Sequence, residues 1–268
     1  MRFLKAHAYG NDFLYVAKEA ARGRSPEALA RALCDRHTGI GADGLILYER
    51  AADGASMQLF NADGSRAEVS GNGVRALGAL LLRDVSRLEA TLTIHTDAGP
   101  KRLERIGQDG SRQVFRTAMG LPRDVRQVTL SAAGEALPLV LMDFGNPQCV
   151  VLGPLPGTDR FERLGNVLAH HEMFSDGTNV EFADVEQPDS VRILIWERGV
   201  GPTASSGTGS CAALVAAAAF GGASREADVI APGGTQHVAW RDDSVYLTGW
   251  AEVLADGEWL AARQIPRT

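Results

Sequence analysis

Two serines in this chain open the same short pattern, once in each half of the sequence. Ser70 begins "SGNGVRALGALLL" and Ser206 begins "SGTGSCAALVAAAA". The first N–H groups of a helix have no intrahelical acceptor, and the helix dipole adds positive charge at that end. Glycines in the first turn let an anionic ligand approach the backbone. A serine N-cap on a loose turn is the better explanation of one copy, but two copies in corresponding positions favour a carboxylate-binding site.

The segment after each serine predicts a buried helix. Val74, Leu77 and Leu81 form an apolar stripe at helical spacing in the first segment, and the second segment is apolar almost all round. We expect the N-terminal ends of these helices to point toward each other across a domain interface. Both serines would then face one ligand from opposite sides, in a shared cleft.

The elements around the two helices predict an α+β fold. Ser25 and Pro26 are typical of an N-cap followed by the first helical residue, and a second amphipathic helix begins near Asp159. Strand-like segments lie at 57–60, 91–96, 137–144 and 191–196. Because each serine pattern follows such a strand, we predict two pseudo-symmetric domains. The N-terminal domain is expected at 1–112, completed by 250–268, and the C-terminal domain at 113–249, with the active-site cleft between them.

Polar side chains in turn-like settings are the other candidates for a ligand site. They are Asn11 in "YGNDF", Asn61 in "FNADGS", Asn146 in "FGNPQ" and Asn179 in "GTNVEF". Asparagine in such places is usually a turn residue. Glu197 and Arg198 end an apolar strand, which is typical either of a solvated strand end or of an ion clamp. In the clamp, the glutamate binds an ammonium group and the arginine binds a carboxylate, so the ligand would be a small zwitterion.

Composition argues against several other classes of function. The chain has 268 residues, 45% of them hydrophobic, a formal net charge of −6 and no dense run of lysine or arginine. That argues against nucleic-acid and membrane partners. The longest apolar run, around 212–220, is too short to cross a bilayer, and the N-terminus lacks a signal-peptide pattern. The three cysteines and six histidines show no metal-ligand spacing. We therefore expect a cytoplasmic protein without a metal site.

An ordered set of motifs resembles the diaminopimelate epimerase family across nearly the whole chain. The motifs are "GNDF" (10–13), "DRHTGIGADGL" (35–45), "FNADGS" (60–65), "SGNGVR" (70–75), "GNPQCV" (145–150), "GTNVEF" (177–182), "WERGVGPT" (196–203), "SGTGSCAA" (206–213) and "PGG" (232–234). The resemblance implies two mirrored domains, each a barrel-like mixed sheet around a central helix. It implies a cofactor-independent isomerase that interconverts LL- and meso-diaminopimelate in lysine and cell-wall synthesis, and it is compatible with a homodimer.

The resemblance also implies a set of substrate contacts. Carried over position by position, the side chains in contact with substrate are Asn11, Asn61, Asn146, Asn179, Glu197 and Arg198. Backbone donors to the α-carboxylate are Gly71, Asn72, Gly207 and Thr208. These donors lie in the first turns of the two expected helices, where the sequence pattern alone places an anion site.

The catalytic positions depart from the family. Ser70 and Ser206 stand where the family carries two cysteines, one removing the α-proton while the other donates a proton to the opposite face. Thiols suit this role because their reference pKa is about 8.5, whereas a serine hydroxyl needs a neighbouring base to activate it. Gln148 stands where the family usually has histidine.

Three accounts of the serines stay open. In the first, both cysteines were deliberately replaced to trap an inactive form. In the second, a natural branch still isomerises with another base. In the third, the cleft binds a related amino acid or performs a different reaction, such as that of another isomerase or lyase of the superfamily with Glu197 or Glu68 as its base. Gln148 favours natural divergence, because a designed double replacement has no reason to change it.

Overall fold

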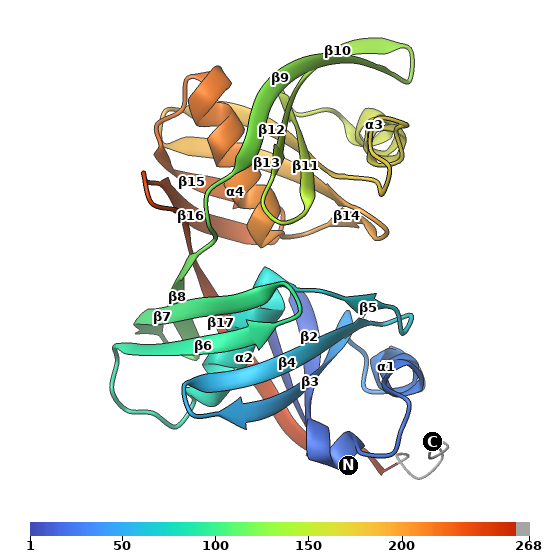
Figure 1. Cartoon of the computed structure of the whole chain (residues 1–268), viewed down its shortest axis with the longest axis vertical. Coiled ribbons are helices and arrows are strands. Elements are labelled where there is room, and N and C mark those ends of the chain that lie inside the picture. Colours follow the sequence, from blue (N-terminus) through green and yellow to red (C-terminus); the bar gives the residue numbers. More distant parts are fainter. Residues whose placement is uncertain (261–268) are drawn as a thin grey trace. The chain divides into compact units, whose positions relative to one another are not determined.

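The computed structural model describes residues 1–260, which divide into two compact units. The first unit comprises Met1–Thr117 together with residues 250–260, and the second comprises Ala118–Gly249. One long strand, β17 (Val245–Glu258), begins in the second unit and continues into the first. Figure 1 labels the elements of both units.

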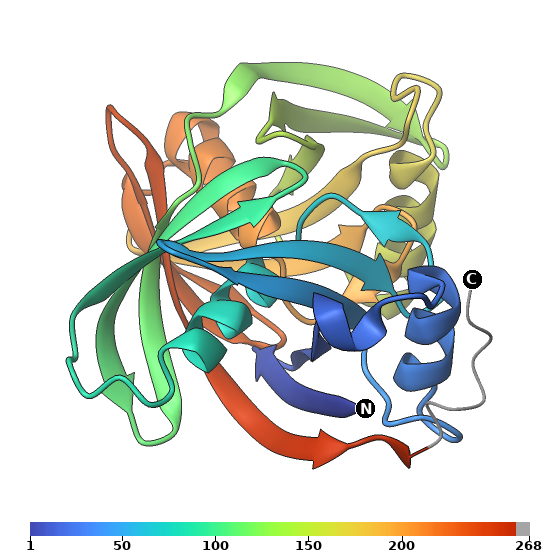
Figure 2. The same cartoon turned by 60° about the horizontal axis from the view of Figure 1, so that its bottom comes forward.

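The first unit is a mixed sheet whose strand pairings close on themselves. Its elements are β1 (Arg2–Ala8), β2 (Asn11–Ala17), the 3-10 helix η1 (Lys18–Ala21), α1 (Pro26–Cys34), β3 (Gly44–Ala51), β4 (Gly54–Asn61), β5 (Arg66–Ala67), α2 (Gly71–Leu81), β6 (Ala90–Thr96), β7 (Gly99–Asp109) and β8 (Arg112–Ala118). The pairings run β1–β2–β3–β4–β6–β7–β8, and β17 pairs with both β8 and β1. Figure 2 shows β17, in red, alongside β1, in dark blue.

The second unit repeats this layout. Its elements are β9 (Arg123–Ala132), β10 (Glu135–Asp143), β11 (Pro147–Leu152), α3 (Thr158–Ala169), β12 (Asn179–Gln187), β13 (Ser190–Glu197), β14 (Gly201–Thr203), α4 (Gly207–Ala216), a single π-helical turn η2 (Ala217–Gly221), β15 (Glu226–Ala231) and β16 (Gly234–Trp240), followed by β17. Strands β11 and β12 are parallel like β2 and β3, and β13 and β15 are parallel like β4 and β6. The α+β fold with two pseudo-symmetric halves is thus confirmed.

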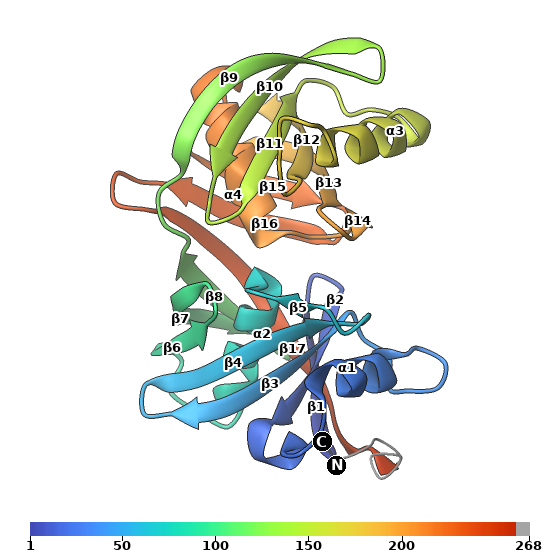
Figure 3. The ribbon, with the colours of Figure 1, turned by 45° about the vertical axis from the view of Figure 1, so that its right-hand side comes forward.

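In each unit one helix is enclosed by the sheet and the other covers its outer face. Helix α2 packs on side chains such as Tyr15 and Ile46, and α4 packs on Ile193 and Val238. Helix α1 instead packs with Leu14 and Leu45, the alternate residues of the same strands. Figure 3 shows α3 on the outside of the second unit and α4 among its strands. Since both faces of these strands are buried, their sequences show little polar alternation.

The predicted helix starts are confirmed. Ser25 Oγ accepts a hydrogen bond from Ala28 N at 3.2 Å, and Pro26 is the first residue of α1. Helix α3 begins at Thr158, beside the expected Asp159. Among residues 1–260, no helix combines the length and the apolarity needed to span a bilayer.

Candidate active site

The two serines begin their helices with the same local geometry. Ser70 has φ −128° and ψ 123°, and Ser206 has φ −135° and ψ 132°. Each Oγ accepts a hydrogen bond at 3.1 Å from the third helical residue, Gly73 N in α2 and Gly209 N in α4. Both serines are therefore N-caps, and both side chains lie beside the positive end of a helix dipole. This confirms the two helices that the repeated pattern predicts.

The glycine in each first turn lies close to a side-chain end on the facing strand, which would have to shift to make room for a Cβ. A Cβ on Gly73 would lie 2.8 Å from Ile46 Cδ1, and a Cβ on Gly209 would lie 2.6 Å from Glu181 Oε1. Ile46 belongs to β3 and Glu181 to β12, the corresponding strand of the second unit. The two turns are thus equivalent in backbone and differ in the chemistry of the side chain behind them.

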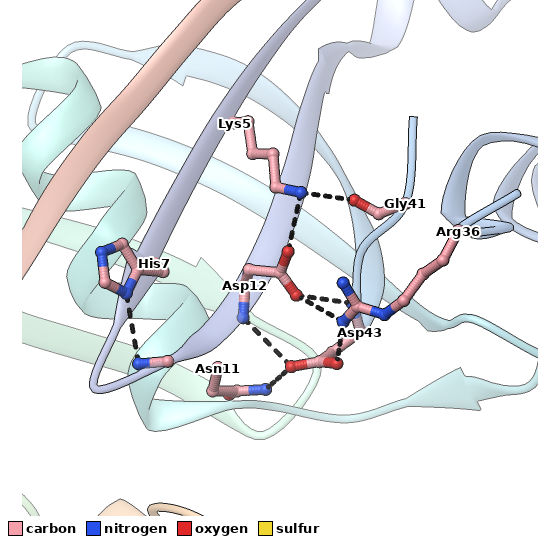
Figure 4. A network of polar contacts seen from close by, with 8 residues as sticks. Lys5, His7, Asn11, Asp12, Arg36, Gly41 and Asp43 are labelled. Carbon is pink, nitrogen blue, oxygen red and sulfur yellow. Dashed lines mark hydrogen bonds and ion pairs between the residues drawn. The ribbon is translucent and has the colours of Figure 1, made fainter. Parts of the chain in front are cut away.

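In the first unit, Asn11 is held by a network of charged groups (Figure 4). Asn11 Nδ2 donates to Asp43 Oδ2 at 2.8 Å, and Asp12 N donates to the same oxygen at 3.1 Å. Arg36 Nη2 donates to Asp43 Oδ1 at 2.7 Å and to Asp12 Oδ1 at 2.9 Å, and Lys5 Nζ lies 2.8 Å from Asp12 Oδ2. The carboxylates therefore fix the start of β2 and, with it, the Asn11 side chain.

The network reaches the first turn of α2. Asn72 Nδ2 donates to Asn11 Oδ1 at 3.4 Å, and Arg75 Nη1 donates to Asn72 Oδ1 at 3.3 Å. Asn61, at the end of β4, donates from Nδ2 to a different partner, Ser65 Oγ, at 3.0 Å. Of the predicted residues in this unit, the structure links Asn11 with Asn72.

Replacing Arg36 by alanine is expected to make the protein more sensitive to acid. Burial disfavours the charged form of Asp12, but Lys5 and Arg36 outweigh it and hold the pKa of that carboxyl below its usual value. A depressed pKa contributes stability that is present above the unfolded-state value and is lost as pH falls through the folded-state value. Without Arg36 the folded-state pKa rises, so acid unfolding begins sooner.

Circular dichroism across an acid titration measures this effect. The unfolding midpoint of Arg36→Ala should move to higher pH by roughly 0.3 to 0.5 unit. Arg66→Ala is a matched control, because Arg66 is similarly exposed and pairs with Asp97 at 2.9 Å on the surface. A midpoint unchanged in Arg36→Ala, or equally changed in both variants, would show that the network does not stabilise charged Asp12.

In the second unit, the structure brings the predicted residues together in two pairs. Asn146 Nδ2 donates to Thr208 Oγ1 at 3.5 Å, beside the first turn of α4, and Gln148 Nε2 donates to Asn146 Oδ1 at 2.8 Å. Arg198 N donates to Asn179 Oδ1 at 2.9 Å, and the Arg198 guanidinium donates to Asp176 O at 3.0 Å. Glu197 Oε1 accepts from Thr203 Oγ1 at 2.9 Å. Glu197 and Arg198 therefore have different polar partners.

Glu181 is a polar residue near the second turn that the sequence analysis missed. It lies on β12, is 0% exposed, and neither carboxyl oxygen has a hydrogen-bond partner among the described residues. Burial, with a further contribution from the charge of Glu197, raises the pKa of Glu181 well above its usual value. Its neighbours in sequence, Val180 and Phe182, are buried on the α3 side, so Glu181 faces the interior beside α4. A buried carboxyl with a strongly raised pKa is a candidate functional group.

Solved structures of the same fold support the architecture. A probable proline racemase from Agrobacterium radiobacter is 18% identical, with a TM-score of 0.71, and the match covers 96% of this chain and 92% of that one. A predicted epimerase from Pseudomonas aeruginosa is 16% identical, with a TM-score of 0.73, and the match covers 97% of this chain and 99% of that one. At such identities the likeness establishes the fold alone.

Sequence comparison goes further. The family model described as diaminopimelate epimerase matches residues 3–124 and 140–254. The diaminopimelate epimerase of Desulforudis audaxviator is 39% identical, and the match covers 98% of this chain and 100% of that protein. Diaminopimelate epimerase 1 of a Nostoc species is 37% identical, with coverage of 96% and 99%. The resemblance carried by the ordered motifs is confirmed, and the chain belongs to the diaminopimelate epimerase family of amino-acid isomerases.

Proposed function

We propose that this protein inverts the α-carbon of diaminopimelate, or of a closely related zwitterionic amino acid, by exchanging its α-proton without a cofactor. Ser70 and Ser206 stand at the two positions that act on opposite faces of that carbon. The observation that carries the proposal is the matched pair of helix starts. Each offers a hydroxyl beside a first turn whose N–H groups and dipole stabilise negative charge.

The reaction needs this arrangement for a physical reason. When the Cα–H bond breaks, its electron pair spreads onto the neighbouring carboxylate, which gains negative charge. Helix N-termini stabilise such charge without reorganising. We assign the backbone of Gly71, Asn72, Gly207 and Thr208 to the α-carboxylate, and the side chains of Asn11, Asn61, Asn146, Asn179, Glu197 and Arg198 to the remaining polar groups of the substrate. A homodimer in the cytoplasm is part of the same proposal and rests on the family resemblance.

A binding protein without catalysis is the second candidate, and one observation favours it. Within residues 1–260, the hydrogen bond to each serine oxygen comes from a helix N–H, and no histidine, lysine or carboxylate is bonded to either hydroxyl. A serine without a bonded base is a poor proton acceptor.

Incubation with LL-diaminopimelate in heavy water distinguishes the two. If the protein is an isomerase, the NMR signal of the α-proton decays and the meso form appears, at a low rate that Ser70→Ala and Ser206→Ala abolish. Calorimetric titration of the same samples measures binding. Tight binding with no exchange at high protein concentration would support the binding protein instead, and absence of both would contradict both candidates.

A further inference from the structure

Four buried acceptor oxygens in the described part of the second unit have no hydrogen-bond donor. Gln148 Oε1, Gln236 Oε1 and both oxygens of Glu181 are buried without a protein donor among the described residues. The amide nitrogens of the two glutamines are already used, one by Asn146 Oδ1 at 2.8 Å and one by Ser205 Oγ at 3.0 Å. A protonated carboxyl is itself a donor, so an acceptor-rich interior favours a proton on Glu181.

The charged and titratable neighbours of Glu181 act in the same direction. Glu197, at the end of β13, repels a second negative charge, and Cys149 on β11 is an uncharged thiol whose own pKa burial raises. The Ser206 hydroxyl, at the start of α4, lies beside Gly209 as Glu181 does. No cation contributes to the shift of Glu181. Burial and the charge of Glu197 both disfavour the charged form of Glu181 and hold its pKa well above the usual value.

Glu181 and the Ser206 hydroxyl both lie beside Gly209 in the first turn of α4, without a hydrogen bond between them. A Cβ on Gly209 would lie 2.6 Å from Glu181 Oε1 and 3.1 Å from Ser206 Oγ, so the two oxygens border the same small space. Ser206 Oγ accepts one hydrogen bond, from Gly209 N. A hydroxyl has a second acceptor site and one donor proton, which leaves room for a bond from Glu181 and a bond toward substrate.

The first unit lacks this arrangement. Ile46 occupies the corresponding position on β3, and its Cδ1 lies 2.8 Å from the Cβ position of Gly73. Tyr15 Oη, a buried polar group in that interior, donates to the backbone oxygen of Gly73 at 2.9 Å. A buried carboxyl, Glu181, therefore lies beside the helix that Ser206 begins, whereas the equivalent residue beside the helix that Ser70 begins is the apolar Ile46.

We propose that Glu181 is a positioning residue that exchanges a proton with the Ser206 hydroxyl, so that this pair replaces a thiol as the acid–base group of the second unit. The inference rests on the proposed function for its purpose. As donor, the Ser206 O–H bond breaks and a Cα–H bond forms, while the Glu181 O–H bond breaks and restores the serine proton, leaving Glu181 ionised. As acceptor, the pair starts with Glu181 ionised: the Cα–H bond breaks and a new Ser206 O–H bond forms, while the original serine proton passes to Glu181.

A thiol placed at position 206 reports on this proton exchange without any turnover. In Ser206→Cys, the rate of alkylation by iodoacetamide follows the thiolate fraction as pH rises. If the thiol and Glu181 exchange protons, the rate should rise in two steps whose apparent pKa values differ by at least about one unit, because coupled groups titrate as a pair. With Glu181→Gln added, it should rise in one step. Profiles identical in the two backgrounds would overturn the proposal.

Ser70→Cys is the matched control, since Ile46 stands behind that position. Its alkylation profile should be the same with and without Glu181→Gln. The natural cysteines are buried and do not compete, and burial raises the pKa of Cys34 to about 12. A change in the Ser70→Cys profile equal to that in Ser206→Cys would show a general structural effect and count against the proposal.

An infrared titration of the unaltered protein covers the case in which Glu181→Gln does not fold. The carbonyl band of a neutral carboxylic acid should persist at pH 7, and its absence would overturn the proposal. Where α-proton exchange is measured, Glu181→Gln should lower it about tenfold and remove one limb of its pH profile. Absence of α-proton exchange in the unaltered protein would contradict the proposed function. The thiol titration would still show whether residues 181 and 206 share a proton.

Discussion

Replacing both Ser70 and Ser206 by cysteine is expected to raise the rate of α-proton exchange by at least about 100-fold. A positioned acid or base of suitable pKa contributes roughly 10² to 10⁴ in rate, and a thiol is far closer to that optimum than a hydroxyl. Both positions are helix N-caps, where the dipole stabilises a thiolate and lowers its pKa further. The measurement is the decay of the α-proton signal of LL-diaminopimelate in heavy water.

The single replacements separate the two positions. Inversion needs a group on each face of the α-carbon, so one thiol alone should give only part of the gain, and the two effects should not add. A thiol accepts the N-cap hydrogen bond from the third helical N–H more weakly than a hydroxyl does. We therefore expect each replacement to lower the free energy of unfolding by about 1 kcal/mol. A double variant that folds and binds substrate, but stays inert, would show that the pocket itself has changed.

The repeated serine pattern predicted the part of the fold that matters most for function. A short pattern that caps a helix is a local signal, so Ser70 and Ser206 could be placed from sequence alone. The sequence around Val74 predicts a helix with one apolar face, whereas in the structure every residue of α2 from Asn72 to Leu80 is buried. The difference arises because the sheet encloses the helix, and enclosure depends on strand pairings distant in sequence.

Glu181 shows why the chemistry behind the second turn could not be predicted. In "TNVEFADV", the alternation of valine, glutamate and phenylalanine is typical of a strand with one face exposed to solvent. In the structure neither face of β12 is exposed to solvent at this point, because α3 covers one face and α4 covers the other. The departure from pattern falls beside a candidate catalytic residue, which is where local rules are most often broken.

A buried arginine in the first unit is a second exception of this kind. Arg105 on β7 is 3% exposed, and its strand neighbour Leu103 faces the same interior. The guanidinium donates to the backbone oxygens of Leu82, Val85, Arg87 and Leu88 and to Gln113 Oε1. Gln113 Nε2 in turn donates to Ala79 O at 2.8 Å. Arg105 therefore satisfies the carbonyls at the C-terminal end of α2 and in the loop that follows it.

Arg105→Ala is accordingly expected to destabilise the first unit by about 3 kcal/mol or more. Truncation leaves several carbonyl oxygens without a donor inside the protein, and breaking a buried charged network typically costs this much. For a chain of this size the melting temperature should fall by roughly 6 to 12 °C, as measured by calorimetry or circular dichroism.

Arg102→Ala is the matched control for Arg105→Ala on the same strand. The Arg102 side chain is 67% exposed and lies 3.7 Å from Glu104, so its loss should change the free energy of unfolding by less than about 0.5 kcal/mol. Since Arg105 fixes the far end of the helix that Ser70 begins, its removal should also loosen that helix and slow α-proton exchange in the double cysteine variant. Equal stability losses in the two alanine variants would mean that water replaces the guanidinium at little cost, and that α2 is held by its apolar contacts alone.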